Sequence, residues 1–125
     1  MKVFDLLKTA LAIVMMAVAV NASAHHSFAM FNTDQELSVT GVVTTFSWRN
    51  PHVMIDLNVV DKDGTTTGYR IESGSVNLLM REGWKPNAIK KGDEVTIVFN
   101  PLKNGQAGGL LIKVIRADGS VINGV

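Results

Sequence analysis

The chain has 125 residues and contains no cysteine. This absence excludes disulfide bonds, thiolate metal ligands and thiol nucleophiles, so packing must supply the stability of the fold. Aromatic residues make up only 6% of the chain, which has three prolines and a formal net charge of +1. With no basic run, this composition gives no support to binding of nucleic acid or of an anionic membrane surface.

The sequence also lacks an apolar run of the roughly 20 residues that a membrane-spanning helix requires. Its longest apolar run, residues 10–20, is followed by the small residues Ala22 and Ala24, the pattern that signal peptidase recognises. We therefore expect residues 1–24 to be a signal peptide cleaved after Ala24, and the mature protein to be periplasmic without a membrane span. Cleavage after Ala22 and an uncleaved anchor are the alternatives.

The expected signal peptide contains Lys2, Asp5 and Lys8. Because the whole chain has 12 basic and 11 acidic side chains, the remainder carries equal numbers of each. We expect residues 25–125 to fold as a single small domain with one core.

Alternation of apolar residues predicts five β-strands, at about residues 36–48, 52–60, 66–72, 94–99 and 110–116. Gly41, inside the first, indicates a bulge or a point where the strand bends. After Ser75 the period changes, because Val76, Leu79 and Met80 recur at helical spacing and Gly83 supplies a stop. One short helix is therefore expected between the third and fourth strands.

This order of elements predicts a mainly β protein, a small OB-like five-stranded barrel in which the helix closes one open end with Val76, Leu79 and Met80. The alternative is a half-open β-sandwich. Trp84 is expected in the core, and the residues expected to be mostly buried are Val43, Val53, Ile55, Leu57, Ile71, Leu79, Val95, Ile97 and Ile112.

Several short motifs together resemble a family of short exported bacterial proteins known only as a domain of unknown function. They are Ala24-His25-His26-Ser27-Phe28, Gly41-Val42-Val43, Trp48 with Asn50-Pro51-His52, the segment from Asn77 to Trp84, and Lys91-Gly92-Asp93. Members commonly have Ser-Pro before the helix, where this chain has Ser75-Val76. The resemblance implies periplasmic export and a small β-rich fold, and it implies no reaction.

The three histidines, His25, His26 and His52, suggest a metal site. Cleavage after Ala24 would expose the α-amine of His25 beside two imidazoles, and neutral nitrogen ligands suit Cu(II), Ni(II) or Zn(II). Such a site requires the amino-terminal arm to fold back to the second strand, with Phe28 and Phe31 contacting the barrel. Cleavage after Ala22 would instead place His25 third in the mature chain. The structural alternative is a frayed terminus.

The corner between the first two strands contains Trp48, Arg49, Asn50, Pro51 and His52. This mixture of aromatic, cationic and amide groups is typical of a recognition loop, and the alternative is that Trp48 packs the barrel end while Asn50-Pro51 makes a turn. No catalytic pattern is present, so we expect no enzyme. The sequence thus favours a binding or accessory module with an unidentified periplasmic protein or small ligand as partner. Copper is a candidate cofactor, and a copper-dependent oxidoreductase is a further alternative.

Overall fold

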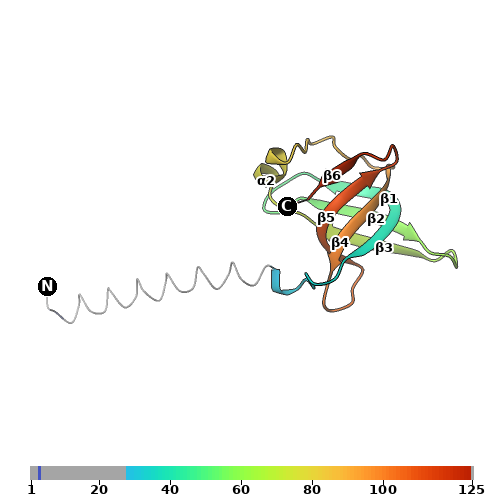
Figure 1. Cartoon of the computed structure of the whole chain (residues 1–125), viewed down its shortest axis with the longest axis horizontal. Helices are drawn as coiled ribbons and strands as arrows, with labels where there is room; N and C mark the ends of the chain where they lie inside the picture. The colour runs from blue at the N-terminus through green and yellow to red at the C-terminus, as the bar shows by residue number, and fades with distance from the viewer. Residues whose placement is uncertain (1–2, 4–27, 125) are drawn as a thin grey trace. The chain divides into compact units, whose positions relative to one another are not determined.

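The computed structural model describes residue 3 and residues 28–124 of the chain (Figure 1). The chain divides into two compact units, Met1–Met30 and Phe31–Val125, and the second contains all of the β-structure described below. Among the described residues, no helix has the length and apolar character needed to cross a membrane.

The second unit contains six strands and one helix. In chain order they are β1 (Leu37–Ser47), β2 (Met54–Val60), β3 (Thr66–Glu72), α2 (Val76–Arg81), β4 (Glu94–Pro101), β5 (Gly108–Arg116) and β6 (Val121–Asn123). The five predicted strands and the helix are confirmed. The last strand, β6, was not predicted, because three residues are too few to show a period.

The sheet closes into a barrel (Figure 1). Its strands follow the order β3-β2-β1-β4-β5-β6, and a further parallel pairing joins β3 to β5, from Arg70 opposite Gly108 to Glu72 opposite Leu110. This pairing confirms the predicted five-stranded barrel and excludes the half-open sandwich. The strand β6 extends the sheet beyond the barrel, antiparallel to β5.

Strand β1 is shared between two partners, which gives the barrel its curvature. It pairs with β4 from Leu37 to Val42 and with β2 from Val42 to Ser47. Gly41 lies just before the change of partner and is buried, and a Cβ there would collide with the carbonyl oxygen of Asn58. The register shift itself lies between Val43 and Thr45, so Gly41 permits close approach of the strands and is not the bulge.

The core contains every residue predicted to be buried except Ile112, which is only half-buried. A register shift explains this error: Phe99 lies opposite Leu111, whereas Val98 lies opposite Lys113, so Ile112 has no residue opposite it. Along β5, the residues that face the core therefore change from odd-numbered to even-numbered positions. Residues 111 and 114 are buried, where strict alternation predicts 110, 112 and 114.

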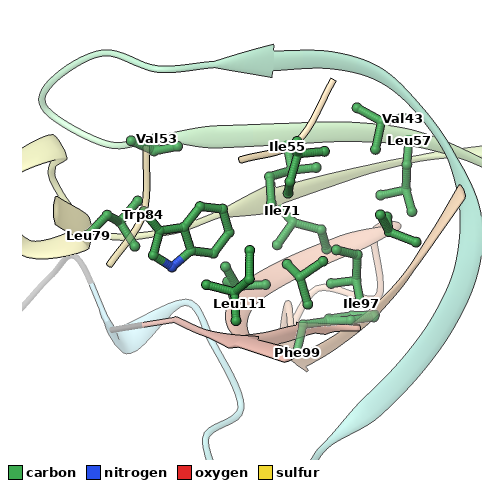
Figure 2. Packing of buried hydrophobic residues seen from close by; sticks show 14 residues of the cluster. Val43, Val53, Ile55, Leu57, Ile71, Leu79, Trp84, Ile97, Phe99 and Leu111 are labelled. Carbon is green, nitrogen blue, oxygen red and sulfur yellow. The ribbon is translucent and has the colours of Figure 1, made fainter. Parts of the chain in front are cut away.

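The two ends of the barrel differ, and we call them the helix end and the loop end. At the helix end, Leu79 and Trp84 are buried and lie beside Val53, as Figure 2 shows. The backbone N–H of Trp84 donates to the carbonyl of Leu79 at 3.0 Å, and its indole N–H donates to the carbonyl of Asn123 at 2.7 Å. The prediction that Trp84 belongs to the core is confirmed.

One part of the predicted helix packing is wrong. Met80 was expected to help close the barrel, but it is 58% exposed, because in the short helix α2 only Leu79 is fully buried and Val76 is half-buried. Trp84, in the turn after the helix, is buried instead, and its larger side chain closes this end of the barrel together with Leu79.

The loop end lies beyond Phe99 and contains the loop between β4 and β5 and the segment that precedes β1 (Figure 1). Phe31 is buried there and forms an isolated bridge with Leu102, and the N–H of Asn32 donates to the carbonyl of Pro101 at 2.8 Å. Phe31 therefore contacts the barrel as predicted, whereas Phe28 is 58% exposed.

Candidate functional site

The corner formed by residues 48–52 connects β1 to β2 at the helix end. The side-chain oxygen of Asn50 accepts a hydrogen bond of 3.0 Å from the backbone N–H of Val76, at the start of α2. Next to it, the N–H of Val53 donates to the carbonyl of Gly74, and the N–H of Ser73 donates to the carbonyl of Val53, both at 2.9 Å. These three bonds hold the corner against the segment that leads into the helix.

Within the corner, the side chains divide into a packed residue and an exposed group. Trp48 is half-buried against the core, with its ring centroid 5.8 Å from that of Phe46. Arg49, Asn50 and Pro51 are exposed. Trp48 therefore packs the barrel end, and Arg49 and Pro51 present a cationic and an apolar side chain to solvent, while the exposed Asn50 holds the N–H of Val76.

His52 lies at the start of the outward row of β2. Its Nδ1 atom is 3.4 Å from a carboxylate oxygen of Glu72, with the two side chains 42% and 24% exposed. Further along the same pair of strands, Arg70 lies 3.8 Å from Asp56. Ion pairs with this much exposure contribute about 0–1 kcal/mol each, and the contact of His52 is an ion pair only when its imidazole is protonated. They give the β2–β3 surface a polar character and add little to its stability.

Metal binding by the three histidines receives no geometric support from the part of the chain that is described. Between residues 28 and 124, no three His, Asp or Glu side chains are grouped so as to hold an ion. His25 and His26 lie outside the described residues. Of the proposed set of His25, His26 and His52, only His52 is among the described residues.

The covalent chain limits how that set could form. Phe31 bridges Leu102 at the loop end, whereas His52 precedes β2 at the helix end. A site shared by all three histidines therefore requires the chain from His25 to Phe31, which spans at most about 20 Å when fully extended, to run along the barrel toward β2. The set of His25, His26 and His52 stays a prediction.

A cavity of about 510 Å³ opens at the loop end. It is lined by residues from the segment before β1, from β1, β3 and β4, from the loop that follows β4 and from the start of β5; they are Asn32, Gln35, Leu37, Thr67, Tyr69, Phe99, Pro101, Leu102, Lys103, Gly105, Gln106, Ala107 and Gly108. The sequence analysis did not identify this site. The one local signal was the polar and glycine-rich composition of residues 103–108, Lys-Asn-Gly-Gln-Ala-Gly.

Comparison of the sequence with known protein families shows where this chain belongs. Residues 12–113 match the profile of DUF6152, a family of unknown function. The chain belongs to the DUF6152 family. The matched range includes the corner, the helix and β1 to β4, and it extends into β5, so the resemblance seen in the sequence motifs is confirmed. A search of curated proteins finds no match for this DUF6152 chain.

Proposed function

We propose that this DUF6152 protein is a small periplasmic binding module that recognises a partner protein through the corner at residues 48–52. The observation that carries the proposal is the hydrogen bond from Val76 to the side chain of Asn50, because it holds an exposed loop in one conformation. A loop that is ordered before binding loses less conformational entropy when a partner docks, so more of its contact energy becomes affinity.

The composition of the surface supports a protein partner. Arg49 supplies five N–H donors, and the half-buried Trp48 adds aromatic surface; both residue types are enriched at the centres of protein interfaces. On the neighbouring helix, Leu78 and Met80 are 44% and 58% exposed. Apolar side chains beside a cationic group match the usual arrangement of a buried contact with a polar rim.

The test is retention of a periplasmic partner on the purified protein, followed by an affinity measurement with that partner. We expect Arg49→Glu and Met80→Asp each to weaken binding about tenfold or more, as loss of a central interface side chain commonly does. Asn50→Ala should have a smaller effect, because it loosens the corner without removing a contact. Lys62→Glu, an exposed charge reversal in the β2–β3 hairpin, is the matched control. Equal loss in Lys62→Glu, or no loss in Arg49→Glu, would contradict the proposal.

A second candidate function is copper binding at the mature amino terminus. It is favoured by the order Ala22-Ser23-Ala24-His25-His26, which would present one α-amine and two imidazoles if cleavage follows Ala24. Nitrogen ligands of this kind suit Cu(II), and their protonation should weaken binding below about pH 6.5, the reference pKa of imidazole.

Intact mass of the exported protein, with and without Cu(II), tests both the cleavage site and the metal stoichiometry. We expect one Cu(II) per chain, bound more weakly when an extra residue precedes His25, because that residue separates the α-amine from the imidazole. His52→Ala tests whether the third histidine joins the site, and it should weaken Cu(II) binding if the amino-terminal arm folds back to β2. If the extra residue has no effect, the amino-terminal site is wrong; redox turnover of the loaded protein would test the oxidoreductase alternative.

A further inference from the structure

We propose that the cavity at the loop end is a second binding site, independent of the corner, and that it takes a small saccharide bearing one carboxylate. Its volume, about 510 Å³, falls within the range of roughly 300–1,000 Å³ typical of small-molecule sites, which are often found in the mouths of β-barrels. This inference goes beyond the proposed function, because no residue of the corner lines the cavity.

Part of the cavity lining is aromatic and apolar. Tyr69 and Phe99 meet edge to face with centroids 6.0 Å apart, and Leu37 and Leu102 also line the cavity. Phe99 is buried, whereas Tyr69 is half-buried and lines the cavity with part of its surface accessible. An aromatic surface of this kind suits the C–H face of a sugar ring, which is apolar although the ring edge is hydroxylated.

The rim is polar and is held in place by hydrogen bonds. The side-chain amide of Asn100 donates to the backbone carbonyl of Gln35 at 2.8 Å, and the side-chain oxygen of Asn104 accepts from the N–H of Gln106 at 3.0 Å. The N–H of Leu102 donates to the carbonyl of Gly108 at 3.1 Å, which closes the base of the loop. The rim is therefore organised without a ligand.

The polar groups around this rim select the ligand class. Three carboxamides line the cavity, from Asn32, Gln35 and Gln106, and Thr67 and Tyr69 add hydroxyl groups. The amide of Asn32 donates to the side-chain oxygen of Gln35 at 3.4 Å, and its own side-chain oxygen accepts from the N–H of Asp34 at 3.3 Å, so the amide of Gln35, the carboxamide of Gln106 and the hydroxyl groups supply most of the donors and acceptors. Vicinal hydroxyls of a sugar also donate and accept at once, so they can satisfy such a mixed rim.

The charge of the residues that line the cavity narrows the class of ligand further. Among the described residues that line the cavity, Lys103 is the only charged one, and none carries a carboxylate. A metal ion or an amino-acid ammonium group would need a carboxylate partner, and a nucleotide would need several cations. A single carboxylate on a sugar pairs with the one lysine, so a sugar acid fits the lining better than these alternatives.

The experiment is an NMR titration of ¹⁵N-labelled protein with three probes at millimolar concentration. D-Galacturonate has both the sugar ring and the carboxylate, D-galactose has the ring without the carboxylate, and acetate has the carboxylate without the ring. We expect galacturonate to shift the backbone amides of residues 67–69 and 102–108 and to bind about tenfold more tightly than galactose, as one charge-assisted hydrogen bond implies. Acetate should shift none of them.

Two variants separate the role of Lys103 from general electrostatics. Lys103→Gln should lower the affinity for galacturonate to that for galactose, and Lys62→Gln, at an exposed position outside the cavity lining, should change neither. Equal binding of galactose and galacturonate to the unmodified protein would overturn the assignment to sugar acids. Absence of any shift, or shifts confined to residues 48–52, would overturn the site itself. Because the corner variants leave the cavity intact, failure here is distinguishable from failure of the partner-binding proposal.

Discussion

The two ends of one barrel have opposite properties. At the helix end, Leu79 and Trp84 are 0% and 2% exposed and fill the opening. At the loop end, Phe99 is buried but the space beyond it forms a cavity of about 510 Å³. The difference arises from the connections: the chain after β3 returns a helix and a tryptophan to the barrel axis, whereas the chain after β4 forms a glycine-containing loop at the rim. Buried side chains therefore close the helix end, whereas the loop end has accessible polar surface within a concavity.

The largest expected effect is at the helix end. Trp84→Ala should lower the free energy of unfolding by about 3–5 kcal/mol, because it removes a buried aromatic ring, leaves a cavity and leaves the carbonyl of Asn123 without its indole donor. Leu37→Ala, at the mouth of the cavity, should cost less than about 1 kcal/mol, because Leu37 is already 41% exposed. Urea denaturation followed by circular dichroism measures both. Similar losses in the two variants would remove the contrast between the ends.

A smaller effect is expected where β5 meets β4 near the loop end. Gly109 is buried, and a Cβ at this position would collide with the carbonyl oxygen of Asn100 and press on the ring of Phe99. Gly109→Ala should therefore destabilise the protein by about 1–3 kcal/mol through overpacking. Gly68→Ala is the matched control, because the nearest atom to its new Cβ is 3.8 Å away. Thermal unfolding of the two variants should differ clearly, and equal midpoints would show that closure of the barrel tolerates a side chain at Gly109.

The smallest effect should have the opposite sign. Ser73, which follows β3 at the helix end, is 1% exposed, and its hydroxyl has no hydrogen-bond partner among the described residues. Ser73→Ala removes the cost of burying an unpaired hydroxyl, so we expect the protein to gain about 1 kcal/mol of stability. Chemical denaturation should show a higher midpoint with an unchanged slope. A loss of more than about 1 kcal/mol would mean that the hydroxyl is satisfied and contributes to the packing of the helix end.

Much of the fold could be predicted from local pattern. Val53, Ile55 and Leu57 alternate strictly and are all buried, because side chains in a strand point to opposite faces with a period of two. The prediction failed at Ile112, where a bulge opposite Val98 and Phe99 changes which residues face inward. A bulge depends on how two strands pair, so the sequence of one strand does not reveal it.

The two candidate sites differ in the same way, because one is made of residues contiguous in the sequence and the other of residues far apart. The corner was predicted because its residues are contiguous, and the aromatic, cationic and amide types stand together in the sequence. The cavity was missed because Gln35, Tyr69 and Gln106 are far apart along the chain and come together only when the barrel closes. The bond between Asn50 and Val76 was also not predictable, since it joins residues 26 positions apart.

The sequence by itself determined β1 to β5, the short helix between β3 and β4, most apolar residues of the core and membership of the DUF6152 family, because periodicity and motifs are local properties. Only the tertiary structure decided that β3 pairs with β5, that Trp84 and not Met80 closes the helix end, and that the loop end contains a cavity. Each of these features depends on contacts between segments distant in the chain, whose energies arise only when the barrel is assembled.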